Sequence, residues 1–144
     1  IGPCELIAAI APYLTLPELL RGRDVMHWID NTGALSALIK GYSGKPDLAR
    51  ITSVFHMFNC GLQSRVYFEY VESKANVADL PSRDSFELLD SLRSARVDMR
   101  LPSPSEWDES LSYWRDLATP SLHVRKRARP HKRKRSMPST IRAV

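Results

Sequence analysis

The chain has 144 residues, 43% of them hydrophobic, and a formal net charge of +5. These values fit one globular domain with a core of moderate size. The longest apolar stretch, residues 6–20, contains Pro12, Pro17 and Glu18 and is shorter than the roughly 20 residues of a membrane helix, so no membrane span is expected.

The positive charge gathers at the C-terminal end of the chain. Nine of the 21 basic residues lie in residues 121–144, which leaves 21 − 9 = 12 basic residues against 16 acidic residues in the rest. We expect residues 121–144 to be a disordered basic tail that binds nucleic acid, because clustered cations bind phosphate backbones without sequence preference. A nuclear-import signal and a solvated terminus without function are the alternatives. The predicted nucleic-acid contacts in the tail are Arg125, Lys126, Arg127, Arg129, Lys132, Arg133, Lys134 and Arg135.

The cysteines and histidines do not have the spacing of a zinc site. Cys4 and Cys60 are isolated, and the four histidines form no ligand motif. We therefore expect two reduced, mostly buried thiols in an intracellular protein, and the basic tail adds the nucleus as a second expected location.

A helix is predicted at the start of the chain. Ile7, Ile10, Ala11 and Leu14 recur at positions i, i+3, i+4 and i+7, which places them on one helical face. Pro12 is expected to kink or shorten this helix because proline lacks the amide donor.

The central part of the chain is predicted to hold two strands with two helices between them. Residues 24–29 (DVMHWI) are apolar at both alternating sets of positions, which is typical of an interior strand, and Asp30 is expected to end it. Residues 65–71 (RVYFEYV) are rich in aromatic and β-branched side chains and predict the second strand. The helices are expected over residues 34–40, ended by Gly41, and over residues 47–59, ended by Gly61.

Further helices are predicted after the second strand. Asn76 can cap a short helix, with Asp79 placed three residues later to reach back to the cap. One helix is expected over residues 86–92 and a single amphipathic helix over residues 107–114. The order helix, strand, helix, helix, strand, helix predicts an α/β fold whose neighbouring parallel strands are covered by helices.

Two aspartates are expected at one edge of the predicted sheet. Asp30 ends the first strand, and Asp79 follows the second strand after a short loop. Because ligands of open α/β sheets gather beyond the carboxyl ends of the strands, both side chains can reach the same edge. Converging carboxylates repel each other unless a cation lies between them, and oxygen ligands suit Mg²⁺ or Mn²⁺.

Three short segments resemble the ribonuclease H domains of retroelement reverse transcriptases. The segment ELIAAI (residues 5–10) is similar to the first long helix of that family, whose glutamate is catalytic. The segment WIDNT (residues 28–32) is similar to its central strand, which ends in a catalytic aspartate, and NVADLPSR (residues 76–83) resembles its closing motif. The three segments occur in the order of the family, which strengthens motifs that are weak one by one.

The resemblance implies hydrolysis of the RNA strand of RNA–DNA hybrids by four carboxylates that hold two Mg²⁺ or Mn²⁺ ions. It assigns Glu5, Asp30 and Asp79 as catalytic metal ligands. Arg83 is a candidate for a contact with phosphate, and the alternative is a solvated arginine at the surface. The partners that it implies are the hybrid and the rest of a reverse transcriptase polyprotein.

The family fold begins with three strands before the glutamate-bearing helix, and the first of them carries the fourth carboxylate. No residues precede Ile1 in this sequence. The expectation is therefore a partial ribonuclease H-like fold that lacks these strands, in a fragment of a longer protein or a degenerate copy, with weak or no activity on its own. Its predicted parts are residues 1–93 as the partial domain, residues 94–120 as a linker with an amphipathic helix, and residues 121–144 as the tail.

Each proposed ligand also has a structural alternative. Glu5 suits the first turn of a helix through the helix dipole, Asp30 suits the start of a turn, and Asp79 suits a cap. For the whole chain, the alternatives are a non-catalytic nucleic-acid-binding remnant that uses the basic tail, and another nuclease or transposase on the same fold.

Overall fold

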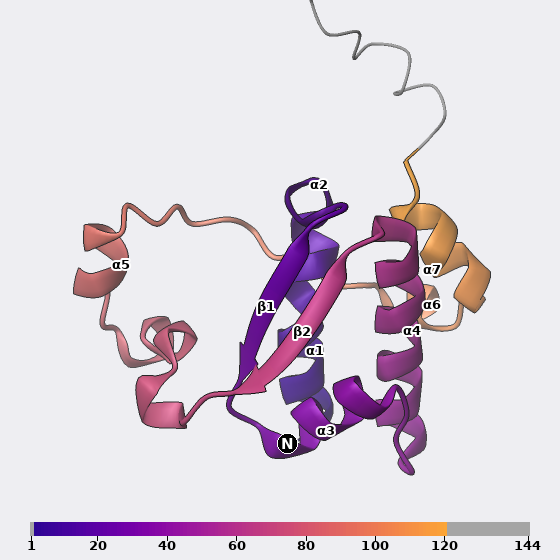
Figure 1. Cartoon of the computed structure of the whole chain (residues 1–144), viewed down its shortest axis with the longest axis horizontal. Helices are drawn as coiled ribbons and strands as arrows, with labels where there is room; N and C mark the ends of the chain where they lie inside the picture. The colour runs from indigo at the N-terminus through magenta and orange to yellow at the C-terminus, as the bar shows by residue number, and fades with distance from the viewer. Residues whose placement is uncertain (1, 121–144) are drawn as a thin grey trace, which may run out of the picture.

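The computed structural model describes residues 2–120, so the predicted basic tail lies outside the described residues. The fold is α/β, with a two-stranded parallel sheet packed against helices (Figure 1). The elements are α1 (Gly2–Thr15), α2 (Pro17–Leu20), β1 (Asp24–Ile29), α3 (Thr32–Lys40), α4 (Pro46–Leu62), β2 (Arg65–Tyr70), the short 3-10 helices η1 (Ser73–Ala75), η2 (Val77–Asp79) and η3 (Pro81–Arg83), α5 (Glu87–Ser91), α6 (Pro104–Trp107) and α7 (Leu111–Ala118). The predicted order of the main elements and the parallel pairing of the strands are confirmed.

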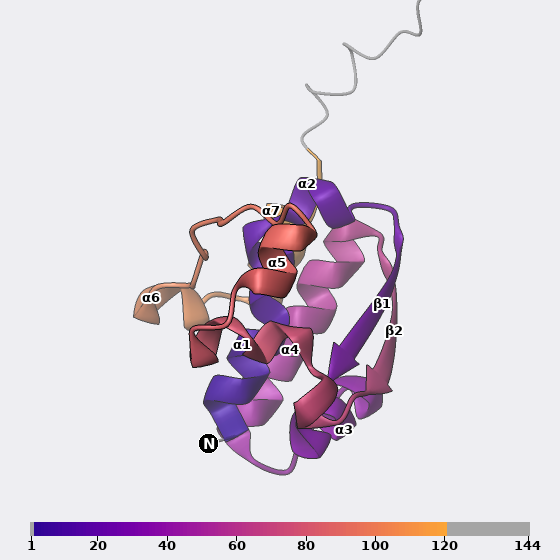
Figure 2. The same cartoon turned by 90° about the vertical axis from the view of Figure 1, so that its left-hand side faces the viewer.

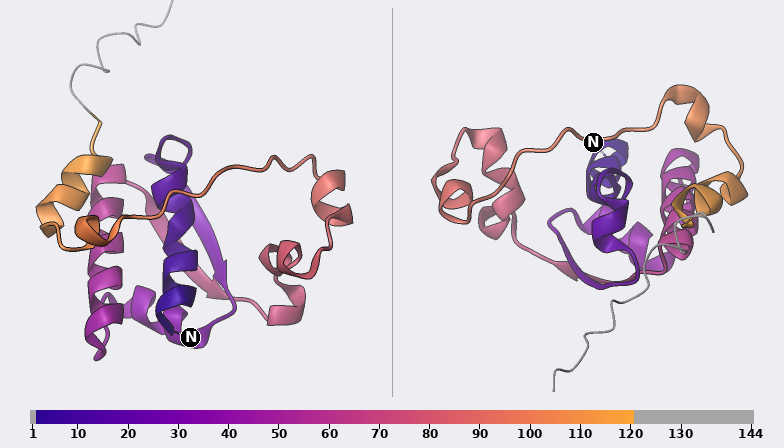
Figure 3. Two further views of the ribbon diagram at one scale, coloured as in Figure 1. Left: turned by 180° about the vertical axis from the view of Figure 1, so that it is seen from behind. Right: turned by 90° about the horizontal axis from the view of Figure 1, so that it is seen from above.

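The helices α1 and α4 lie on one face of the sheet, as the view from above in Figure 3 shows. The core forms between them from Leu6 and Ile10 of α1 and Val54 and Phe55 of α4, all of them buried. Alternate strand residues such as Ile29 point into this core, because successive side chains of a strand face opposite sides. The connection from β1 to β2 through α3 and α4 is the crossover that two parallel strands require.

The prediction that residues 24–29 form an interior strand was wrong: among residues 2–120, this strand has a neighbour on one side only. That neighbour is β2, in a register that runs from Asp24 opposite Arg65 to Ile29 opposite Tyr70. Met26 and Trp28 point away from the helices and are 56% and 54% exposed. The strand also ends at Ile29, so Asp30 lies one residue beyond it.

Local capping explains where α3 begins and ends. The side chain of Asn31 accepts a hydrogen bond from the amide of Ala34 at 2.8 Å, so the helix starts at Thr32, two residues before the predicted start. Gly41 ends it as predicted, with a left-handed φ of 75°. Pro12, by contrast, does not end α1, which continues to Thr15.

The prediction that Gly61 ends α4 was wrong. The helix continues to Leu62 and is capped by Gln63 in the left-handed region, at φ 58°. Gly61 faces α7 instead, where a β-carbon would overlap the carbonyl oxygen of Arg115 and lie 2.8 Å from the β-carbon of Ala118. Its missing side chain allows α7 to approach the α4 backbone closely.

The segment expected as one amphipathic helix forms two, α6 and α7. Ser103 starts α6 in a capping box with Glu106, and Ser110 caps α7. Trp114 of α7 is fully buried in the same core as α1 and α4, with its ring centroid 5.7 Å from that of Trp107. The expectation that the cysteines are buried was wrong, since both thiols are exposed.

Residues 73–101, called the arm below, leave the body of the molecule after β2 (Figures 1 and 2). The arm carries η1 to η3 and α5 and returns to α1, where the amide of Arg100 donates to the hydroxyl of Thr15 at 3.1 Å. None of the helices within residues 2–120 is both long and apolar enough to cross a membrane.

Candidate functional site

Glu5, Asp30 and Asp79 line one cavity of about 670 Å³. They come from the first turn of α1, from the residue after β1 and from the end of η2. The cavity lies at the carboxyl end of β1, the region where ligands of open α/β sheets bind. The three carboxylates named from the sequence therefore lie on the walls of one cavity.

Asp30 is held in place by the turn that follows it. Its neighbour Asn31 is the N-cap of α3: the side chain binds the amide of Ala34 and the carbonyl accepts from the amide of Leu35 at 2.9 Å. This turn follows directly on Ile29, which is anchored in the core. The alternative expected for Asp30 was the start of a turn, but the side-chain hydrogen bond of this turn is made by Asn31, and the Asp30 carboxylate lines the cavity.

Asp79 is held by an ion pair rather than by a helix cap. Asn76 caps η2 as predicted, by accepting from the amide of Ala78 at 3.1 Å. The prediction that the Asp79 side chain reaches back to that cap was wrong: its carboxylate accepts from Arg83 at 3.1 Å. Ser82 donates to the carbonyl of Asp79 at 2.7 Å and fixes the same turn.

The donor chemistry of the cavity fits a hard divalent cation, since all three carboxylates supply oxygen ligands. The positions of these carboxylates are less suited to holding such a cation. No three His, Cys, Asp or Glu side chains of residues 2–120 surround a common point at which an ion could be held. The ion pair with Arg83 uses one of the Asp79 oxygens that a cation would require.

Sequence reasoning missed a polar pair beside this cavity, formed by His27, which lines the cavity, and Tyr13, which does not. The hydroxyl of Tyr13 and the Nδ1 of His27 are 3.0 Å apart, and the two rings stack with centroids 5.6 Å apart. Burial lowers the pKa of His27 and raises the pKa of Tyr13, so both groups are neutral near neutral pH. The signal in the sequence was the position of His27 among the core-facing residues of β1.

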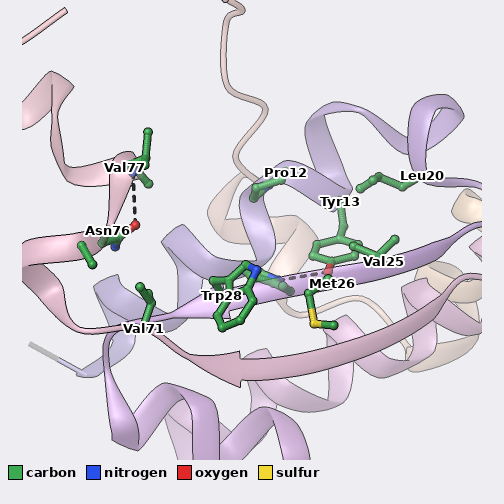
Figure 4. A pocket seen from close by; sticks show the side chains of 12 residues that line it. Pro12, Tyr13, Leu20, Val25, Met26, Trp28, Val71, Asn76 and Val77 are labelled. Atoms are coloured by element: carbon green, nitrogen blue, oxygen red, sulfur yellow. Dashed lines mark hydrogen bonds between the residues drawn. The ribbon is translucent and has the colours of Figure 1, made fainter. Parts of the chain in front are cut away.

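A second cavity, of about 650 Å³, lies beside the first along β1 (Figure 4). Its walls are mainly apolar, and it shares His27, Trp28 and Asn76 with the carboxylate cavity. The sequence predicted residues 24–29 as an interior strand, and this prediction left no room for a cavity along β1.

No model of a known protein family, no curated protein and no solved structure matches the chain.

Proposed function

We propose that the chain acts in a ribonuclease H-type nuclease that hydrolyses the RNA strand of RNA–DNA hybrids with Mg²⁺ or Mn²⁺. One observation carries the proposal: Glu5, Asp30 and Asp79 line one cavity at the carboxyl end of β1. They come from a helix, a strand end and a turn, in the chain order that the resemblance implies. The β1–β2 pair and its crossover are also compatible with a partial ribonuclease H-like fold.

In this proposal, Glu5, Asp30 and Asp79 supply the oxygen ligands for the divalent cations. When bound, such ions activate a water molecule and stabilise the leaving oxygen at phosphorus. Arg83 holds the Asp79 carboxylate while no ion is bound. Once released from Asp79, the Arg83 guanidinium is placed to contact a phosphate of the hybrid.

Cutting by the described residues is expected to be weak. Catalysis by two ions depends on ligands that hold both in register, and no three candidate ligands of residues 2–120 surround a common point. Binding of the hybrid is expected to be stronger than cutting, because the basic tail adds electrostatic affinity without sequence preference.

Incubation of the purified chain with a labelled hybrid and Mg²⁺ tests the proposal. Asp30→Asn is expected to abolish cleavage and to leave hybrid binding intact, since it removes an ionised ligand at nearly constant shape. Asp116→Asn is the matched control, because that carboxylate is exposed on α7 and pairs with Arg115. Cleavage that survives Asp30→Asn, or that needs no divalent cation, would contradict the proposal.

One observation favours a second function, a nucleic-acid-binding protein without catalysis. The described residues contain no group of three side chains ready to hold an ion. In that case the chain binds the hybrid in a salt-sensitive manner and does not cut it, and deletion of residues 125–135 removes the binding. The same assay, run across a series of salt concentrations, separates the two functions.

A further inference from the structure

The edge of β2 that faces away from β1 carries two residues whose peptide groups point outward. The Arg65 amide donates to the Arg23 carbonyl at 2.9 Å, which fixes the residues of β2 that face β1. Because alternate residues of a strand bond to the same neighbour, Tyr67 also bonds to β1, and Val66 and Phe68, called the edge pair below, face outward. A strand added to the other side of β1 would not reach this edge, since β1 and β2 lie between.

Two side chains of the chain itself close the ends of this edge. Before the strand, the Asn59 side chain donates to the Ser64 carbonyl at 3.1 Å. At the end of the strand, the Glu69 carboxylate accepts from the Tyr70 amide at 2.9 Å. Between these points, the amides and carbonyls of the edge pair form no hydrogen bond with any other backbone segment of residues 2–120. The open part of the edge is therefore short and has defined ends.

A hollow of about 410 Å³ lies beside the edge pair. It is lined by Leu38 and Ile39 of α3, by His56 of α4 and by Val66, Tyr67 and Phe68 of β2. Ile39 and Tyr67 are both 60% exposed. The helices thus leave space beside the edge pair, and a further strand there would cover apolar surface while it pairs the peptide groups.

A second copy of β2 matches this edge when the two strands run antiparallel with Tyr67 opposite Tyr67. In that register, Val66 of each copy exchanges two hydrogen bonds with Phe68 of the other, so the amides and carbonyls of both edge pairs are satisfied. Arg65 then lies opposite Glu69 of the other copy, at positions where facing side chains approach most closely. The edge is therefore complementary to itself in both hydrogen bonding and charge.

Arg65 can bind a second copy without losing the partner that it has. Its Nε and Nη2 pair with the Asp24 carboxylate of β1, Nη2 at 2.9 Å, and its Nη1 makes no hydrogen bond within residues 2–120. Glu69 uses one oxygen for the Tyr70 amide, and its second oxygen can accept from Arg65 of the other copy. A shift of the register by two residues in either direction places Arg65 opposite an uncharged residue, so the charges select one register.

We propose that the chain forms a two-fold symmetric dimer in which the outer edges of two β2 strands pair antiparallel, with Arg65 of each copy opposite Glu69 of the other. The joined sheet has four strands in the order β1, β2, β2, β1. This assembly goes beyond the proposed nuclease activity and does not depend on it, because the strand residues that line the carboxylate cavity belong to β1. One strand from each copy makes a small contact, so the dimer is expected at high protein concentration.

Sedimentation and amide hydrogen exchange of the full chain, each measured across a series of protein concentrations, test this proposal. The Val66 and Phe68 amides are expected to exchange more slowly as the protein concentration rises. The Tyr67 amide bonds to β1 and is expected to be protected at every concentration. It therefore reports whether the β1–β2 ladder is intact in each variant.

Charge reversal at the facing positions tests the register. Arg65→Glu brings two acidic side chains opposite each other and Glu69→Arg two basic ones, so each variant is expected to self-associate about tenfold more weakly or worse. An equimolar mixture of the two variants is expected to regain association, because opposite charges face each other again. Glu87→Arg is the matched control, since it makes the same change of charge at an exposed residue of α5, and it is expected to associate as the wild type does.

Four results would overturn the proposal. The first is a monomer at the highest soluble protein concentration. The second is self-association that leaves the Val66 and Phe68 amides unprotected, which places the contact on another surface. The third is a mixture of Arg65→Glu and Glu69→Arg that associates no better than either variant alone. The fourth is protection of the edge pair that does not change with protein concentration, which identifies the same chain as the occupant.

Discussion

Gly61→Ala tests the packing of α7 on α4. Alanine is ordinarily the better helix residue, and at an exposed helix position this change stabilises by about 1 kcal/mol. At Gly61 the new β-carbon would overlap the Arg115 carbonyl oxygen and lie 2.8 Å from the β-carbon of Ala118. Both neighbours are part of α7, so the helix must shift as a unit.

The size of the expected change in the free energy of unfolding follows from the side chains that α7 buries. Trp114 is 0% exposed and Ala118 is 1% exposed, so a shift of α7 loosens the packing of the largest buried side chain. Overpacking of a close core contact costs about 1–3 kcal/mol, and complete loss of a buried tryptophan contact costs about 3–5 kcal/mol. After the gain in helix propensity, Gly61→Ala is expected to lower the free energy of unfolding by about 2 kcal/mol.

Urea unfolding followed by tryptophan fluorescence measures this change, because Trp114 reports directly on the docking of α7. Gly44→Ala is the matched control, since its β-carbon would meet no atom within 4 Å. The control is expected to lie within about 0.5 kcal/mol of the wild type. If Gly61→Ala is at least as stable as the wild type, α7 does not need a glycine at position 61 in order to pack closely on α4.

Three further outcomes are expected. Burial lowers the pKa of His27, so the unfolded chain binds a proton at higher pH than the folded protein does. The free energy of unfolding should therefore be highest above about pH 6.5 and decrease as the pH falls below that value. Urea unfolding between about pH 7.5 and 5.5 measures this pH dependence, which should be absent in His27→Phe. Asn31→Ala should lower the free energy of unfolding by about 1 kcal/mol through loss of the α3 cap, and an unchanged urea midpoint would contradict that role. Arg83→Ala should raise the affinity for Mn²⁺ about fivefold by freeing the carboxylate of Asp79, as measured by titration, whereas Arg115→Ala should leave it unchanged.

Features that depend on residues close in the chain were predictable from the sequence. Asn31 and Gly41 mark the two ends of α3, because a cap and a left-handed residue act within one helical turn. The strand at residues 65–70 followed from its side chains, which are typical of strands. The parallel pairing of the strands followed from the two intervening helices, since such a pair requires a long crossover.

The candidate site was predictable in part for the same reason. Asp30 follows a strand, and Asp79 lies in a turn after the next strand, so the topology alone placed both near one end of the sheet. Glu5 was named from the resemblance, and only the structure places it on the wall of the same cavity. The partner of Asp79 was not predictable, because the cap residue Asn76 lies three residues before it and Arg83 four residues after it, and both are within reach of its side chain.

Contacts between distant segments were decided only by the tertiary structure. Gly61 is locally suited to ending a helix, and its actual role depends on Arg115 and Ala118, which α7 brings against it. An apolar strand such as residues 24–29 can lie inside a sheet or at its edge. Its side chains do not determine whether one or two neighbouring strands form hydrogen bonds with its backbone. The sequence by itself determined which segments form strands and helices, and tertiary packing determined which of their surfaces stay open.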